Sequence, residues 1–182
     1  PPARPDISKK RSFMKIAIFS DFHGQTDAYE RFSELVKEEK PDKIVLLGDM
    51  TNKDGDISAA RLTMANVYVP IIMVEGNCDV RGIGERIGVT CPGYTYLIED
   101  GERKLLFAHG HTVNSGCLPS FMGKGDAFFF GHLHFPEISI VRGVACVCVG
   151  SMSRPRAGAP TCYAVYEGGV ITVKNALTKE TV

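Results

Sequence analysis

All five histidines of the chain lie in three short clusters, and each cluster also contains a glycine. The clusters read Asp21-Phe22-His23-Gly24, His109-Gly110-His111 and Gly131-His132-Leu133-His134, and between them stand Gly48-Asp49 and Gly76-Asn77-Cys78-Asp79. Neutral imidazole, carboxylate and amide oxygen are ligands that divalent metals accept in proteins. The grouping therefore predicts a metal site, and the function of the chain can be argued from that site.

Three short apolar runs position these residues in the predicted fold. We expect three buried strands, over residues 14–20, 43–48 and 70–76. A polar residue follows each strand directly, namely Asp21, Asp49 and Asn77. Helical spacing of apolar residues over 27–40 and 57–66 predicts a helix between each pair of strands, which gives a βαβαβ unit with parallel strands. Ligands of open α/β sheets bind outside the carboxyl ends of the strands, so the three polar residues are expected at one rim.

The pattern changes after about residue 90 to closely spaced strands. We expect strands over 94–99, 104–109, 127–131, 136–142, 144–149, 162–167 and 170–176, with hairpin turns at Gly101, Gly143 and Gly168-Gly169. Phe128-Phe129-Phe130 is interpreted as a core strand rather than an exposed aromatic platform. The prediction is an α/β fold in which a second sheet packs on the first and helices lie outside.

Composition limits the classes of function. The 182 residues carry 21 Lys+Arg and 21 Asp+Glu, so the formal net charge is zero and no extended nucleic-acid surface is expected, although a local nucleotide site stays open. No apolar run reaches the roughly 20 residues that cross a bilayer, and no signal peptide is evident. Six cysteines without a CxxC pair are interpreted as buried small hydrophobes in a reducing compartment. We therefore expect a cytoplasmic protein that does not bind membranes.

The domain organisation follows from the same reading. Residues 1–13, with three prolines and five charges, are interpreted as a disordered extension or a remnant of cloning. Residues 14–182 are expected to form a single domain.

Taken in order, the motifs Asp-x-His-Gly, Gly-Asp, Gly-Asn-Cys-Asp, His-Gly-His and Gly-His-x-His resemble those of the calcineurin-like metallophosphoesterases. The similarity is greatest to the small YfcE-like phosphodiesterases and extends from Met14 to about residue 178. It implies a four-layer αββα sandwich of two mixed sheets flanked by helices, with a centre of two divalent metals. Mn²⁺ is the expected metal, with Fe, Zn, Co or Ni as other occupants, because several imidazoles disfavour Mg²⁺ and Ca²⁺.

The resemblance also implies a division of the ligands between the two metals. One metal would be held by Asp21, His23 and His134, the other by Asn77, His109 and His132, and Asp49 would bridge them through its two oxygens. The implied activity is a phosphodiesterase in which a metal-activated bridging hydroxide attacks phosphorus. Asp49 and Asn77 would thus serve catalysis as well as metal binding.

The chain departs from the wider superfamily at Cys78, where many members have a histidine that can protonate the leaving group. His111 is therefore the candidate for assisting the leaving group or contacting phosphate. The expected substrate-binding residues are Asn77, His111, Cys78 and Arg154. A structural role for His111 and a solvated surface role for Arg154 stay open. Phe22 replaces a small residue and is expected to narrow the rim near the metals. Asp79 is interpreted as a structural support for a turn.

Two other functions remain as alternatives. A non-catalytic scaffold on the same fold, like the retromer subunit, would have lost metal ligands, and its contacts would use apolar residues such as those of 113–118. A phosphomonoesterase is the second alternative, because monoesters and diesters differ in charge and in the groups around the site, and the sequence discriminates between them weakly. The expected substrate is a small phosphodiester or a nucleotide-like molecule, and a homodimer is the working expectation for the oligomeric state.

Overall fold

The computed structural model describes residues 13–52 and 55–182, and within them two five-stranded mixed sheets. The first sheet has the order β10-β9-β1-β2-β3, and its strands are β1 (Lys15–Phe19), β2 (Lys43–Leu46), β3 (Ile71–Met73), β9 (Cys162–Glu167) and β10 (Val170–Asn175). β1, β2 and β3 are parallel, as their buried apolar runs predicted, and β9 joins β1 antiparallel. The predicted extension falls, except for Phe13, outside the described residues.

The second sheet has the order β4-β5-β6-β8-β7. Its strands are β4 (Thr95–Asp100), β5 (Arg103–Ala108), β6 (Ala127–Phe130), β7 (Pro136–Val141) and β8 (Val144–Val149). β5, β6 and β8 are parallel, while β4 and β7 form antiparallel edges. The turns predicted at Gly101, Gly143 and Gly168-Gly169 are confirmed, and each of these glycines has a positive φ that L-residues rarely adopt.

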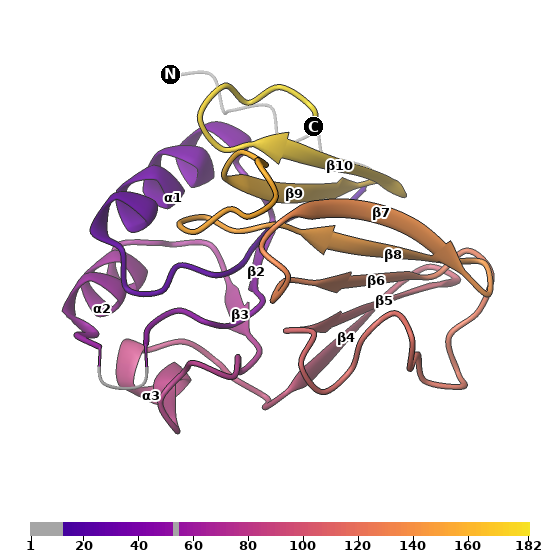
Figure 1. Cartoon of the computed structure of the whole chain (residues 1–182), viewed down its shortest axis with the longest axis horizontal. Coiled ribbons are helices and arrows are strands. Elements are labelled where there is room, and N and C mark those ends of the chain that lie inside the picture. The colour runs from indigo at the N-terminus through magenta and orange to yellow at the C-terminus, as the bar shows by residue number, and fades with distance from the viewer. Residues whose placement is uncertain (1–12, 53–54) are drawn as a thin grey trace, which may run out of the picture.

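Helices cover the outer face of the first sheet (Figure 1). α1 (Thr26–Glu39) and α2 (Ser58–Ala65) confirm the two predicted helices, and α1 buries one stripe that includes Tyr29, Phe32 and Leu35 against the sheet. A third helix, α3 (Ile83–Ile87), was not predicted. It is five residues long between Gly82 and Gly88, which is too short for an apolar period to appear.

The core between the two sheets joins them into one sandwich. Phe107 and Phe129 of the second sheet are fully buried and stack at 5.2 Å, and Val45 and Tyr166 of the first sheet belong to the same cluster. Burying each such side chain contributes roughly 1.5–3 kcal/mol. The α/β sandwich expected from the sequence is confirmed, and Phe128 to Phe130 are buried in it.

The outer face of the second sheet is covered by turns rather than by a helix. Residues 110–126 contain no helix, and Val113, Leu118 and Met122 of this segment pack on Phe128 and Phe130. Val113 and Leu118 are thus partly buried against the protein's own sheet, and a role of residues 113–118 in partner contact stays a prediction. No helix in the described part of the chain is long and apolar enough to span a bilayer.

Candidate metal centre

The predicted ligands follow the carboxyl ends of the parallel strands, and both sheets contribute. Asp21 follows β1, Asp49 follows β2 and Asn77 follows β3, while His109 follows β5 and His132 follows β6. Among the described residues, nine other than glycine have a positive φ, and five of these are predicted ligands, namely Asp21, His23, Asp49, His132 and His134. Left-handed backbone is unfavourable for such residues and is typical of functional sites. These turns direct ligand side chains from separate strands to one rim.

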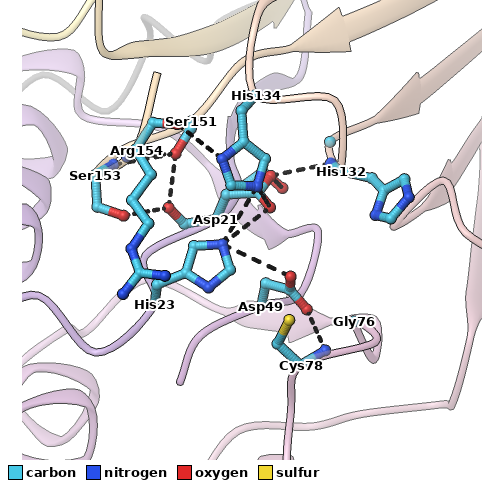
Figure 2. Close-up of polar contacts among 12 residues, drawn as sticks. Asp21, His23, Asp49, Gly76, Cys78, His132, His134, Ser151, Ser153 and Arg154 are labelled. Carbon is cyan, nitrogen blue, oxygen red and sulfur yellow. Dashed lines mark hydrogen bonds and ion pairs between the residues drawn. The ribbon is translucent and has the colours of Figure 1, made fainter. Parts of the chain in front are cut away.

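The first group of ligand atoms surrounds Asp21 (Figure 2). Asp21 Oδ1 lies 3.0 Å from His134 Nε2 and 3.7 Å from His23 Nε2, and the two imidazole nitrogens are 3.3 Å apart. Asp49 Oδ2 lies 3.7 Å from His23 Nε2. The structure thus brings Asp21, His23, His134 and Asp49 together, the set predicted for one metal and its bridge.

The second group surrounds His109 Nε2, which no solvent reaches. This atom lies 3.0 Å from Asn77 Oδ1, 3.3 Å from His132 Nδ1 and 3.4 Å from Asp49 Oδ2. The structure brings together the residues predicted for the other metal as well. Asp49 Oδ2 is common to both groups, whereas Asp49 Oδ1 accepts a hydrogen bond from the Cys78 amide at 2.8 Å. The two oxygens of Asp49 therefore have different surroundings, and the bridging role of this carboxylate stays a prediction.

The chemistry of these atoms fits a bound cation. His109 Nδ1 donates to Leu47 O at 2.8 Å, and His134 Nδ1 donates to Arg154 O at 2.7 Å. In the neutral form of each ring, Nε2 therefore carries no proton and offers a lone pair. They face other acceptors, and buried Asp21 Oδ1 has no hydrogen-bond donor. Ligand atoms around an ion with bonds of about 2.0–2.2 Å lie roughly 2.8–3.6 Å apart. The observed separations of 3.0–3.4 Å fall within this range, and the two that join His23 Nε2 to Asp21 and Asp49 lie just above it at 3.7 Å.

Charge also favours a cation. Burial opposes ionisation of Asp21, but His134, His23 and His109 hold the pKa of its carboxyl well below the usual range. Burial acts against protonation of His109, yet Asp49 and Asp21 outweigh it and raise the pKa of that imidazole. The site thus keeps two buried carboxylates ionised and attracts positive charge.

Two glycines are required because backbone approaches the carboxylates closely. A Cβ on Gly76 would overlap Asp49 Oδ1, and a Cβ on Gly131 would overlap Ser20 Oγ and Asp21 Oδ2. Neither position has an unusual φ, so the requirement is one of space. This explains why glycine stands in both of these motifs.

Asp79 fixes one side of the site from behind. Its carboxylate accepts backbone N–H bonds from Asp49, Met50 and Gly76 at 2.8–2.9 Å and from Thr51 at 3.2 Å. Burial raises the pKa of this carboxyl, and the backbone donors oppose the shift. The predicted structural role of Asp79 agrees with these contacts, since it ties the turn after β2 to the turn after β3.

Supporting residues around Asp21 and His23 were not identified from the sequence. Ser20 Oγ donates to Asp21 Oδ2 at 2.6 Å, while Ser151 Oγ and Ser153 Oγ both donate to Asp21 O at 2.9 Å. Asn52 donates from Nδ2 to His23 O at 3.2 Å. Of these residues, Ser20 could have been found from its position beside Asp21. Asn52, Ser151 and Ser153 are separated from their partners by 29 to 132 residues in the sequence.

Of the remaining predicted residues, Cys78 places its thiol within 4.8 Å of ligand atoms of His23 and Asp49, whereas His111 and Arg154 belong to none of the candidate metal-binding groups found among the described residues. His111 sits 5.4 Å from His109 between ring centroids, and burial lowers the pKa of its imidazole, with His109 and His132 lowering it further. Cys78 is half-buried, and burial followed by Asp49 raises the pKa of its thiol to about 11. Arg154 has an exposed side chain, and its backbone oxygen orients His134.

The expectation for Phe22 is wrong. Its side chain is fully buried, stacks on Tyr29 at 4.9 Å and meets Phe32 edge-on at 5.7 Å. Phe22 therefore points from the strand end into the core beneath α1 and does not narrow the metal rim. Its apolar area contributes to packing of the helix layer.

Two packed mixed sheets with an Asp, His and Asn cluster at their strand ends define the class of α/β-sandwich phosphoesterases. The sequence model of the calcineurin-like phosphoesterase superfamily domain matches residues 14–168, and the chain belongs to this superfamily. The resemblance seen in the motifs is thereby confirmed, as is the class of phosphoric ester hydrolase at the level of the family.

Individual relatives agree with this assignment. The chain is 29% identical over 175 residues to phosphodiesterase YfcE of Escherichia coli K12, covering 88% of this chain and 91% of the relative. The solved structure of Escherichia coli YfcE superposes with a TM-score of 0.83 at 24% identity, covering 93% and 97% of the two chains. Vacuolar Protein Sorting 29 of Cryptosporidium parvum shares the fold with a TM-score of 0.63 at 17% identity, covering 93% and 95%.

Proposed function

We propose that the protein is a phosphodiesterase with two divalent metal ions at the rim described above. The observation that carries the proposal is the position of Asp49 Oδ2, which belongs both to the group around Asp21 and to the group around His109. A shared carboxylate oxygen between two N/O donor sets is the arrangement that a two-metal hydrolytic centre needs. When bound, such ions supply a nucleophile from water at neutral pH and neutralise charge on the phosphoryl oxygens.

The chain's own residues orient these donors. Leu47 O and Arg154 O hold the Nδ1 protons of His109 and His134, so that each ring presents Nε2 to the site. Asp79 holds the turns that carry Asp49 and Asn77. Rigid ligands of this kind would hold the metal ions in place, so that the ions could orient a phosphate without rearrangement during the reaction.

Leaving-group assistance is assigned to His111 and Asn77 rather than to Cys78. With its pKa raised to about 11, the Cys78 thiol is a poor acid at neutral pH. The lowered pKa of His111 keeps its imidazole neutral there, which lets it donate one hydrogen bond to a phosphoryl or leaving oxygen. Arg154 is proposed to contact phosphate, since its side chain is exposed and its backbone oxygen is the hydrogen-bond partner of His134.

Mn²⁺ is the proposed metal, with Fe, Zn, Co or Ni as alternatives. A cytoplasmic location and a homodimer stay predictions.

The complete set of predicted metal ligands favours an enzyme over a scaffold that lacks metal chemistry. The proteins named above include both kinds, a phosphodiesterase and a vacuolar sorting protein on one fold. The fold alone therefore does not decide between them, and the donor set is the argument.

The test compares bis(p-nitrophenyl) phosphate with p-nitrophenyl phosphate after loading with Mn²⁺. We expect release of p-nitrophenol from the diester, a lower rate with the monoester, and loss of both rates after chelation. Faster hydrolysis of the monoester would favour the phosphomonoesterase. No turnover of either ester by protein that retains metal would contradict the enzymatic function and favour a scaffold.

A further inference from the structure

A pocket opens beside the candidate metal centre and has not yet been given a role. It has a volume of about 600 Å³ and begins at Asn77 and His111. Its outer wall is formed by Tyr94, Arg81 and Glu75. This volume is within the roughly 300–1,000 Å³ typical of small-molecule sites. Because the pocket starts at two residues proposed to contact the phosphate, its occupant must be a group attached to that phosphate.

The walls of the pocket are held together by the backbone. Glu75 N donates to Gly93 O at 2.9 Å, which joins the segment after β3 to the segment before β4. A β-bridge between Ile72 and Thr90 joins β3 itself to the segment before β4. The pocket is therefore a preformed feature of the fold rather than a gap between independent loops.

Tyr94 presents an aromatic surface at the mouth of this pocket. Its side chain is 53% exposed, and its ring meets His111 edge-on with centroids 5.7 Å apart. The contact fixes the ring while leaving more than half of the residue accessible. A large aromatic side chain held in this way next to a phosphate site is suited to stack on a planar ring.

The two charged residues of the outer wall are complementary and unpaired. Within the described residues, no opposite charge lies within 4.0 Å of Arg81 or of Glu75. One offers hydrogen-bond donors and the other offers acceptors. A second phosphate in the pocket would be repelled by Glu75 and by the nearby Asp79 carboxylate, and an alkyl chain would leave both charges without partners.

We infer that this pocket binds the nucleobase of a nucleotide-containing phosphodiester, with the base against Tyr94 and its polar edge toward Arg81 and Glu75. A nucleobase has the planar face and the mixed donors and acceptors that these three side chains match. The inference rests on the proposed phosphodiesterase function and gives its substrate class. Tyr94 is a binding residue in this account and does not take part in bond cleavage.

The experiment uses two diesters with the same leaving group and different retained groups, p-nitrophenyl thymidine 5′-phosphate and p-nitrophenyl ethyl phosphate. With the Mn²⁺-loaded protein we expect a KM about tenfold lower for the thymidine ester, since its base can stack on Tyr94 and an ethyl group cannot. Tyr94→Ala should remove this difference by raising the KM of the thymidine ester alone. Tyr94→Phe should preserve it, and so should the control Tyr68→Ala, which removes a tyrosine that is 96% exposed and does not line the pocket.

Three outcomes would overturn the inference while both esters are still hydrolysed. The KM values could be equal in the wild type, Tyr94→Ala could affect both esters equally, or it could affect neither. If neither ester is hydrolysed, the proposed function fails, and calorimetry still tests the pocket. Thymidine 5′-monophosphate should then bind the metal-loaded protein more tightly than ethyl phosphate, with Tyr94→Ala cancelling the difference, and equal affinities in the wild type would contradict the inference.

Discussion

The Nε2 atoms of His23 and His134 lie 3.3 Å apart with the Asp21 carboxylate beside them. His134 Nδ1 donates its proton to Arg154 O, so Nε2 of a neutral His134 has a lone pair. A proton or a metal ion must therefore lie between the two Nε2 atoms for their contact to be favourable. Protons and metal ions therefore compete for the same site, and metal binding should depend on pH.

The first prediction concerns this competition. Asp21 raises the pKa of His134, and Asp49 and Asp21 raise that of His109 against the effect of burial. In metal-free protein the stabilisation from these protonated rings is present below about pH 6.5, the unfolded pKa, and is lost as the pH rises through the higher folded pKa. Added Mn²⁺ should therefore raise the Tm more at pH 8 than at pH 6.

The size of this effect follows from mass action. Metal at 100 times its Kd stabilises by about 2.7 kcal/mol, which corresponds to roughly 5–10 °C in a protein of this length. Differential scanning fluorimetry with Mn²⁺ or with a chelator, at pH 6, 7 and 8, measures it. A Tm that does not respond to metal at any of these pH values would contradict binding at the rim.

The second prediction concerns Asp49→Asn, which should weaken both metal sites together. Its Oδ2 faces His23 and His109, and a neutral amide would remove the negative charge shared by the two groups. Loss of a residue that merely supports a ligand reduces metal affinity or activity by about 10–100-fold, so we expect a larger loss here. Metal content per chain, measured by mass spectrometry of the metal, should fall from two to below one.

Asp126→Asn is the matched control for this substitution. Asp126, which directly precedes β6, is also a buried carboxylate. It accepts backbone N–H bonds from Lys104 and Gly123 and is not a predicted metal ligand. Metal content should stay at two in this variant even if stability decreases. Full metal content in Asp49→Asn would show that the bridge is assigned to the wrong residue.

The third prediction concerns Gly76→Ala. The added Cβ would overlap both Oδ1 and the backbone nitrogen of Asp49, so the carboxylate and its turn must move. We expect metal affinity to fall by about tenfold or more, together with roughly 1–3 kcal/mol of stability. Gly123→Ala is the control because its Cβ would point into open space. Metal titration and chemical unfolding of both variants measure the effects, and equal affinities would argue that the close approach of Gly76 is unimportant.

The fourth prediction separates Cys78 from His111. Because the Cys78 pKa is raised to about 11, Cys78→Ala should keep turnover of bis(p-nitrophenyl) phosphate within about threefold of the wild type. His111→Ala should lower kcat/KM by about 100-fold, the usual effect of removing one hydrogen-bond donor to a developing charge. Steady-state kinetics of both variants at equal metal content decide between them, and a reversed order would assign the leaving-group role to the thiol.

Much of the fold and of the predicted ligand set could be read from the sequence because both follow local rules. Apolar runs predicted β1, β2 and β3, and polar residues directly after them predicted the rim. Contacts that depend on tertiary structure could not be read in this way. Ser151 and Ser153 reach Asp21 across more than 100 residues, and nothing near them in the sequence indicates that partner.

Two further differences have physical causes. Phe22 was placed at the rim by comparison with family motifs, but side-chain direction at a strand end depends on the turn, and this turn directs the ring beneath α1. The two oxygens of Asp49 also differ in a way that the sequence did not indicate, since the Cys78 amide donates to Oδ1 while Oδ2 faces both groups of ligand atoms. The position of a residue in the sequence gave its neighbourhood but not its orientation.

The central claim is a pair of metal ions that share Asp49, and anomalous X-ray scattering from Mn²⁺-soaked crystals tests it most directly. We predict two anomalous peaks per chain at the manganese edge, one among Asp21, His23 and His134 and the other among Asn77, His109 and His132, with Asp49 between them. A single peak, or peaks away from these residues, would contradict the account.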